Sequence, residues 1–259
     1  MSRLSVRGLS AKLGGRTILS DISFDADNGV TMLLGPNGCG KSTLIRALAG
    51  SVPCRGAAQL DGMDVLSMGA SARARQIAYL PQRQAWDTQM SVREYVSLGA
   101  GVAGGIFAPP DKKALARADE VISALGLTDL SSRPMCELSG GEARMAGIAR
   151  ALSQGGRFML LDEPLAGLDF RRSHEILDII RRLGKNALIS IHDPALAWQY
   201  GRRVLLMKDG RIAAVGNTGA ESDFEKHLQA VYGENLAFTS VHGRLLPMWR
   251  DIQHRKDSP

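Results

Sequence analysis

An eight-residue stretch near the start of the chain constrains the fold more than any other feature. It fits the pattern G-x-x-x-x-G-K-S/T, and its residues are Gly35, Pro36, Asn37, Gly38, Cys39, Gly40, Lys41 and Ser42. Glycines allow turns that other residues avoid, so backbone N–H groups can surround an anion. The Lys41 ammonium adds charge for the β- and γ-phosphates, and the Ser42 hydroxyl can ligate Mg²⁺. With the adjacent Thr43, the stretch predicts a site for a nucleoside triphosphate.

The residues on either side of this stretch predict a strand before it and a helix after it. Residues 30–34 form an apolar run that is typical of a buried strand. Residues 42–49 have a helical pattern that Gly50 ends. This order directs the positive N-terminus of a helix at the phosphates. The alternative is an ordinary glycine-rich turn, which would need neither a strand before it nor a helix after it.

Composition and charge narrow the class of protein without choosing a partner. The 259 residues are 44% hydrophobic and 22% charged, as in globular domains, and the net charge is +6. That charge suits nucleotide, anionic lipid and nucleic acid alike. Three cysteines without metal-site spacing indicate a reducing compartment. The N-terminus lacks a signal-peptide core, and no run of 18 apolar residues occurs, so we expect a partner to supply any membrane spans.

Hydrophobic periodicity predicts strands and helices that alternate along the chain, and hence an α/β fold. The expected strands are 3–9, 17–25, around 59–60, 77–80, 158–161, 187–191, 204–207, 211–215 and 236–241. The expected helices are 70–75, 91–99, 109–125, 142–153, 171–183 and 222–231.

Helices replace strands between about residues 84 and 140, which predicts an inserted helical subdomain. Ser91 and Glu94 match a capping box at the start of its first helix. Residues 99–108 are rich in glycine and alanine and predict a flexible connector. The expected organisation is therefore one domain over 1–245, with a core of 1–83 and 141–245, and a tail over 246–259.

A second group of polar residues follows the apolar strand that ends at Leu161. Asp162 and Glu163 stand where a doubly wound sheet would bring them beside the phosphate loop. Asp162 would hold Mg²⁺ through its water shell, and Glu163 would polarise the attacking water. The alternative is a strand that ends in a solvated acidic turn.

A third motif lies upstream of this acidic pair, at residues 138–142 (Leu-Ser-Gly-Gly-Glu). Ser139 and the amides of Gly140 and Gly141 would form another anion site at a helix N-terminus. With the phosphate loop and the acidic strand in this order, the chain resembles the ATP-binding cassette (ABC) family of transporter ATPases. The resemblance implies MgATP as cofactor and a head-to-tail homodimer, in which this motif completes the ATP pocket of the opposite subunit.

Other positions extend the resemblance over nearly the whole chain. Residues 79–82 resemble the family's Q-loop, in which Gln82 would sense Mg²⁺ and the attacking water, and residues 165–169 resemble its D-loop. His192 resembles the histidine that contacts the γ-phosphate. The resemblance implies a P-loop NTPase fold: a RecA-like core with a parallel sheet, an N-terminal antiparallel β subdomain and an inserted α-helical subdomain. The implied catalytic residues are Lys41, Gln82, Glu163 and His192, and the implied metal ligands are Ser42, Gln82 and Asp162.

Two positions depart from the family pattern. Leu13 stands where an aromatic residue usually stacks on adenine, which predicts loose base selectivity or a cover supplied by Arg16. Cys39 lies within the phosphate loop near a helix N-terminus, a place that favours the thiolate. We therefore expect alkylation of Cys39 to block ATP hydrolysis; a small tolerated side chain is the alternative.

Residues 90–99 and 230–238 resemble one branch of the family, the importers of ferric siderophores, haem and cobalamin, although Ala100 and Gly101 replace an arginine common there. The branch implies a peripheral subunit at the cytoplasmic face of the inner membrane, bound to permeases and served indirectly by a substrate-binding protein. Nucleic acid is not an expected partner. The alternatives are a soluble ABC ATPase acting on ribosomes or DNA, and the ATPase of an exporter.

Overall fold

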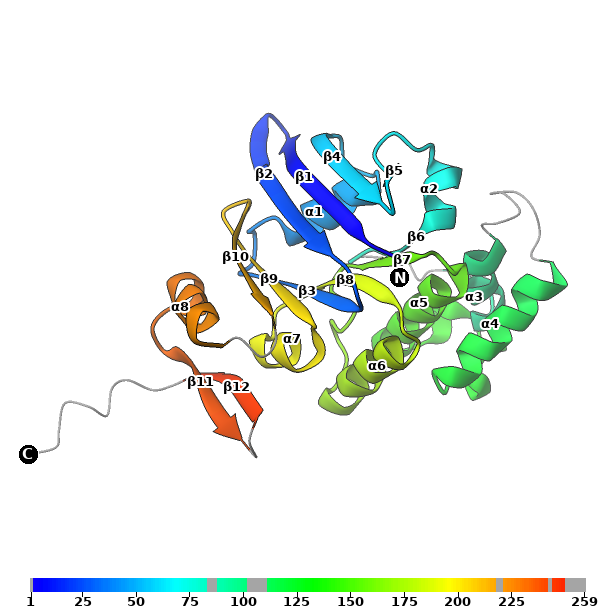
Figure 1. The fold of residues 1–259 in the computed structure, drawn as a ribbon. Coiled ribbons are helices and arrows are strands. Elements are labelled where there is room, and N and C mark those ends of the chain that lie inside the picture. The colour runs from blue at the N-terminus through cyan, green and yellow to red at the C-terminus, as the bar shows by residue number, and fades with distance from the viewer. Residues whose placement is uncertain (1, 83–87, 102–110, 218–220, 242–243, 250–259) are drawn as a thin grey trace, which may run out of the picture.

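The computed structural model describes residues 2–82, 88–101, 111–217, 221–241 and 244–249. Within these ranges the chain forms an antiparallel sheet, a larger mostly parallel sheet, a group of helices at one end and a C-terminal hairpin (Figure 1). The predicted alternation of strands and helices is confirmed, and the fold is α/β. No helix in the described part of the chain is long and apolar enough to cross a bilayer.

The parallel sheet forms the centre of the molecule. Its strands, in spatial order, are β10 (Arg211–Asn217), β9 (Arg203–Lys208), β3 (Val30–Leu34), β8 (Asn186–Ile191), β7 (Phe158–Leu161) and β6 (Ile77–Leu80). Every residue of β3, β7 and β8 is buried, because both faces of the sheet are covered. Only β10 runs antiparallel to its neighbour, at the edge.

An antiparallel sheet and one helix cover the first face of the parallel sheet. That sheet has the order β2 (Arg16–Ala26), β1 (Leu4–Leu13), β4 (Cys54–Leu60) and β5 (Met63–Asp64). Leucines and isoleucines of β1, β2 and the helix α1 (Lys41–Leu48) form one buried cluster with side chains of β3, β7 and β8. Strand β1 extends four residues beyond the expected end at residue 9 because it pairs with both β2 and β4.

Helices cover the second face and build the end of the molecule opposite β10 (Figure 1). They are α3 (Val92–Ala100), α4 (Lys112–Ala124), α5 (Gly140–Gln154), α6 (Phe170–Arg182) and α7 (Pro194–Tyr200), while α2 (Ala70–Gln76) precedes β6. Helix α3 begins with the predicted capping box of Ser91 and Glu94. It includes Gly99 and Ala100, which were expected in the connector; most of that connector lies outside the described residues.

The C-terminal part differs from the expected tail. Helix α8 (Glu221–Tyr232) leads to β11 (Leu236–Val241), which pairs with a strand that was not predicted, β12 (Arg244–Trp249). The expected boundary at residue 245 therefore falls inside β12. The ring of Trp198 on α7 packs against two rings of the C-terminal part, with its centroid 5.1 Å from that of Phe224 and 4.9 Å from that of Phe238. These contacts attach the C-terminal part to the core.

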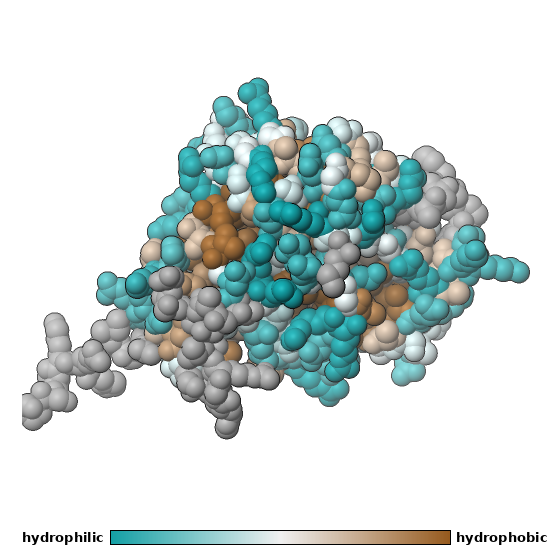
Figure 2. Space-filling model, viewed as in Figure 1, coloured by the Kyte–Doolittle hydropathy of each residue, from teal (hydrophilic) through white to brown (hydrophobic). Residues whose placement is uncertain are grey.

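The face shown in Figure 2 is largely hydrophilic, with apolar side chains gathered over β10. The division into core, helical subdomain and tail stays a prediction.

Candidate functional site

The phosphate loop connects β3 to α1 in the order that the sequence predicts. Gly38 and Gly40 have φ angles of 79° and 108°, a region that favours glycine. A Cβ at Gly38 would meet nothing within 4 Å, so the loop is open on that side. No side chain caps the N-terminus of α1, which begins after Gly40. Its first N–H groups are therefore free of side-chain acceptors, as an anion site requires.

Lys41 lies almost completely buried beneath this loop. Its Nζ donates hydrogen bonds to the carbonyl oxygens of Gly35 (2.6 Å) and Pro36 (3.1 Å), and 4% of the residue is exposed. Burial lowers the pKa of Lys41, although the nearby acidic groups oppose this shift. Both hydrogen bonds go to neutral carbonyl oxygens, and Lys41 lines the cavity described below, so the ammonium can bind an anion there. Phosphate groups are such anions.

Asp162 follows β7 and faces Ser42 across the site. One of its oxygens, Oδ1, accepts hydrogen bonds from the hydroxyls of Ser42 (2.9 Å) and Ser190 (2.8 Å). Burial raises the pKa of Asp162, and these two hydroxyls act against the rise. A carboxylate and a hydroxyl are the hard oxygen ligands that suit Mg²⁺, so these residues fit the ion. When bound, Mg²⁺ would neutralise charge on the phosphates.

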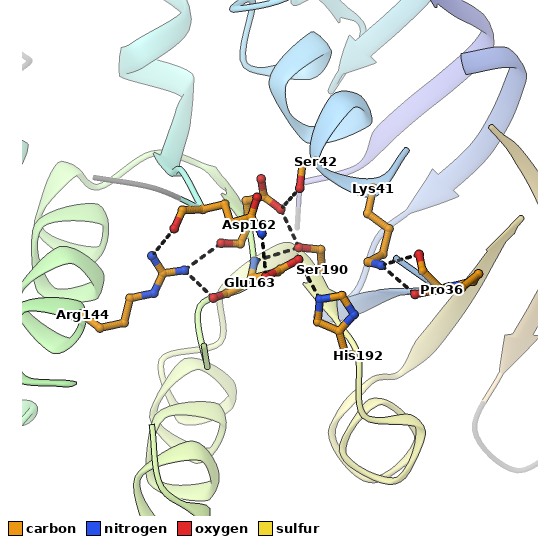
Figure 3. A network of polar contacts seen from close by, with 10 residues as sticks. Pro36, Lys41, Ser42, Arg144, Asp162, Glu163, Ser190 and His192 are labelled. Carbon is orange, nitrogen blue, oxygen red and sulfur yellow. Dashed lines mark hydrogen bonds and ion pairs between the residues drawn. The ribbon is translucent and has the colours of Figure 1, made fainter. Parts of the chain in front are cut away.

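The Glu163 carboxylate contacts both Gln82 and His192, and Figure 3 shows its side chain beside His192. Its Oε2 accepts a hydrogen bond from Nε2 of Gln82 at 2.8 Å, and its Oε1 lies 2.7 Å from Nε2 of His192. Its backbone N–H donates to the hydroxyl of Ser190 at 2.8 Å. The residue has a φ of 49°, a left-handed conformation that is uncommon for residues other than glycine. The fold thus brings together three of the predicted catalytic residues.

A cavity of about 480 Å³ connects the phosphate loop with these catalytic residues. Its lining residues are Leu13, Ile18, Asn37, Gly38, Gly40, Lys41, Ser42, Thr43, Gln82, Glu163 and His192. Leu13 and Ile18 give it an aliphatic part, and the lining residues include no phenylalanine, tyrosine or tryptophan. Arg16, the other expected cover for the base, is not among them. The cavity supports a nucleotide whose base is held without aromatic stacking.

Ser139, Gly140 and Gly141 do not line this cavity. Ser139 caps α5, and Glu142 accepts hydrogen bonds at one oxygen from the N–H (2.8 Å) and hydroxyl (2.7 Å) of Ser139. A Cβ on Gly141 would lie 3.7 Å from Cδ2 of Leu168, which places the start of α5 beside the expected D-loop. The contribution of residues 139–141 to a pocket in a second copy stays a prediction.

The expectation that Cys39 carries a stabilised thiolate is wrong. The residue is only 5% exposed and belongs to the apolar cluster beneath the antiparallel sheet. Burial raises the pKa of the Cys39 thiol, and the charge of Lys41 opposes this only in part. The sequence placed Cys39 near a helix N-terminus correctly, but could not show that its side chain points into the core.

Two residues of the site were not predicted. Ser190 on β8 links Asp162 to the backbone of Glu163, because β8 lies between β7 and β3 in the sheet. Arg144 on α5 is buried and donates to backbone carbonyls around Gln82 and Glu163. The available signal in both cases was a polar residue within a run of buried apolar ones: Ser190 between two isoleucines, and Arg144 within helix 140–154.

Fold and site together define a phosphate-loop nucleoside triphosphatase. The profile of a known family, ABC transporter, matches residues 19–166. The chain belongs to the ABC transporter family, and it is an ATPase that uses ATP with Mg²⁺.

Individual relatives agree with this assignment. The chain is 40% identical to the hemin import ATP-binding protein HmuV of Streptomyces coelicolor, over 81% of this chain and 76% of the relative. It is 36% identical to the Fe(3+) ions import ATP-binding protein FbpC of the same organism, over 100% of this chain and 75% of the relative. The crystal structure of a nucleotide-free ATP-binding cassette from an ABC transporter has the same fold, with a TM-score of 0.76 at 24% identity, over 90% of this chain and 96% of that one. The resemblance of the sequence to the iron and haem importer branch is confirmed.

Proposed function

We propose that this chain is the ATPase subunit of an importer that takes up a metal chelate of the ferric siderophore, haem or cobalamin type through separate permease subunits. The proposal is supported by relatives whose names specify hemin and Fe(3+) import and which match most of this chain. It would be a peripheral protein at the cytoplasmic face of the inner membrane. A substrate-binding protein would serve it only indirectly, through the permeases.

The observation that carries the mechanism is the position of the Glu163 carboxylate between Gln82 and His192. Glu163 accepts a hydrogen bond from the Gln82 amide, and one from His192 when Nε2 of that ring is protonated. These contacts orient the carboxylate toward the cavity, where it would take a proton from the attacking water. His192 would contact the γ-phosphate, and Gln82 would place the water relative to the metal. Catalysis would consist largely of positioning and charge stabilisation.

Phosphate and metal binding would fall to the residues on the opposite side of the cavity. Lys41 and N–H groups of the phosphate loop would bind the β- and γ-phosphates, as the burial of Lys41 and the uncapped start of α1 allow. Ser42, Asp162 and Gln82 would hold Mg²⁺, directly or through its waters. Asp162 is held by two hydroxyls and needs no rotation to face Ser42.

A head-to-tail homodimer would complete the site. Ser139 and the following glycines lie at an exposed helix start beside Leu168, outside the cavity of their own chain. Such a position allows them to cover the phosphates of a second copy. Binding of MgATP would close the dimer and push the permeases between inward-facing and outward-facing states. Hydrolysis would then reset it.

The permeases would dock beside α3. Met90 and Leu98 are large apolar side chains with 38% and 40% exposure; Met90 lies just before this helix and Leu98 near its end. They lie close in sequence to Gln82, so a permease helix seated there could act on the site. Residues 82–91 and the helix predicted over 91–99 are expected to form part of the permease groove; residues 83–87 of this stretch lie outside the described part of the chain.

Purification from the native membrane tests the proposal. The tagged chain, extracted in mild detergent, is expected to retain two permease subunits at high salt. Recovery of ribosomes or DNA, lost steeply as salt rises, would instead support the alternative of a ribosome- or DNA-directed ATPase. A deletion strain should lose uptake of one labelled chelate among ferric siderophore, haem and cobalamin, and recover it with the wild-type gene but not with Glu163→Gln. Loss of export without any loss of uptake would contradict import.

A further inference from the structure

Arg144 on α5 donates hydrogen bonds to five backbone carbonyls. Its Nη1 donates to Pro81 (3.2 Å) and Gln82 (3.1 Å), its Nη2 to Asp162 (2.8 Å) and to Glu163, and its Nε to Pro164 (3.3 Å). A guanidinium group has five N–H bonds, so each one is matched by a different carbonyl. Figure 3 shows the side chain of Arg144 extended toward the backbone of Asp162 and Glu163.

The environment of this guanidinium is unusual for a cation. Arg144 is 5% exposed, and all five acceptors are neutral carbonyl oxygens. Burial lowers the pKa of Arg144, whereas the charges of Asp162 and Glu163 oppose that shift. An apolar side chain at this place would avoid burying a charge, but it would remove one donor from each of the five carbonyls. The contacts therefore point to a role in holding the backbone.

The backbone that Arg144 contacts includes Glu163 and sets the direction of the Glu163 side chain. Glu163 has a left-handed conformation, with a φ of 49°, which is disfavoured for a residue with a Cβ. The carbonyls before, at and after this position all point to Arg144. The same guanidinium holds the carbonyl of Gln82, whose side chain contacts the Glu163 carboxylate. One side chain thus fixes both sides of the Gln82–Glu163 contact.

Arg144 also connects this backbone to the helix that begins after Ser139. Helix α5 starts at Gly140, so Arg144 lies within its first two turns. A displacement of the start of α5 would move the guanidinium, and with it the carbonyls of Gln82 and Glu163. One side chain therefore joins two segments of the same chain. The start of α5 is expected to cover the ATP of a second copy, and the segments around Gln82 and Glu163 are expected to hydrolyse the ATP bound to their own chain.

We propose that Arg144 is a positioning residue for hydrolysis: it sets the Gln82 and Glu163 backbones relative to each other and links their placement to α5. It touches neither nucleotide nor water. The inference rests on the proposed role of Glu163 as the base, and it is independent of the transported cargo.

The test compares the full-length Arg144→Lys and Arg144→Gln variants with wild type. Truncation to alanine would remove all five donors and leave a cavity, so the milder variants are used. Lysine keeps the charge but cannot direct five N–H bonds in the arginine geometry. We expect kcat to fall by roughly 100-fold in both variants, with KM for ATP changed by less than about threefold, since a misplacement near 1 Å acts on chemistry more than on binding. Charge retention in Arg144→Lys should give no rescue.

A double-mutant cycle with Gln82→Ala provides a readout that a merely structural role would not move. If Arg144 acts through Gln82 and Glu163, the losses in kcat should be strongly non-additive. Arg150→Lys is the matched control, since Arg150 is on the same helix and its guanidinium lies 5.4 Å from the centre of the Tyr95 ring. It should retain wild-type kcat.

Three outcomes would overturn the proposal: wild-type kcat in Arg144→Lys or Arg144→Gln, a raised KM with unchanged kcat, or additive losses in the cycle. Glu163→Gln, assayed in parallel, separates the two levels of the argument. Full activity of Glu163→Gln would refute the proposed role of Glu163 as the base, on which the inference rests. An inactive Glu163→Gln together with a fully active Arg144→Lys would refute only the role of Arg144.

Discussion

Nε2 of Gln82 lies 2.8 Å from Oε2 of Glu163, although 81 positions separate the two residues in the chain. The contact forms because β6 and β7 are parallel neighbours whose carboxyl ends meet at the same edge of the sheet. His192, at the end of β8, reaches the other oxygen of the same carboxylate. Hydrolysis should therefore depend on this carboxylate more than on any other acidic group of the protein.

The first prediction concerns the base itself. Glu163→Gln removes the proton acceptor but keeps the shape of the side chain, so kcat should fall by roughly 10²- to 10⁴-fold. ATP affinity should change little, and the variant should accumulate as a dimer in saturating MgATP. Phosphate release and size-exclusion chromatography measure these effects. Glu175→Gln is the control, since Glu175 lies on the exposed side of α6 paired with Arg171; a monomeric Glu163→Gln in saturating ATP would contradict the dimer.

The second prediction concerns the hydroxyl of Ser190, which is fully buried and bonds both Asp162 and the N–H of Glu163. Ser190→Ala leaves that N–H without an acceptor and should reduce the free energy of unfolding by about 1–3 kcal/mol. It should also lower kcat, because Glu163 loses a backbone contact. Ser153→Ala is a matched control: its buried hydroxyl bonds carbonyls of Val96 and Arg150, so it should lose stability without a comparable loss of kcat. Denaturant titration and ATPase assays distinguish the two.

The third prediction concerns the base of the nucleotide. Leu13 lines the cavity where an aromatic ring would stack on adenine. Leu13→Tyr should strengthen ATP binding by about 1 kcal/mol, close to fivefold in Kd, and Leu13→Ala should weaken it. GTP should compete with ATP more effectively in the wild type than in Leu13→Tyr. Equal competition by GTP in both proteins, measured by nucleotide displacement, would show that Leu13 does not face the base.

The fourth prediction concerns thiol reactivity. Because burial raises the pKa of Cys39, its thiolate fraction at neutral pH is smaller than that of an ordinary thiol. Alkylation of the folded protein at neutral pH should modify the exposed Cys136 first and leave ATPase activity intact. Labelling of Cys39 should increase as pH rises above the ordinary range for a thiol. Mass spectrometry of the modified peptides tests this order, and rapid labelling of Cys39 at neutral pH with loss of activity would contradict it.

The fifth prediction concerns the contact between α3 and α5. A Cβ on Gly99 would lie 2.1 Å from the carbonyl oxygen of Arg150, so the two helices approach closely at this glycine. Gly99→Ala should force them apart and reduce the free energy of unfolding by about 1–3 kcal/mol. Gly101→Ala is the control, because a Cβ there meets nothing within 4 Å. Equal thermal midpoints for the two variants would show that the helices separate without loss of stability.

Much of the site was predictable because its chemistry is local in the sequence. The phosphate loop needs particular residue types at consecutive positions, and Asp162 and Glu163 follow an apolar strand directly. The capping box at Ser91 likewise requires only residues 91–94, and the structure confirms it. The strand β12 was missed because residues 244–249 carry a proline and little alternation, and their pairing depends on β11.

The sequence by itself determined the α/β class, the phosphate loop, and the acidic pair Asp162 and Glu163 after an apolar strand, because each of these depends on short-range patterns of residue type. The roles expected of Gln82 and His192 came from the resemblance to the ABC family. Only the tertiary structure decided that Gln82 and His192 hold opposite oxygens of Glu163, that Cys39 points into the core, and that Arg144 binds five carbonyls. The physical reason is that side-chain contacts between distant segments depend on strand order and helix packing, which place one loop against another.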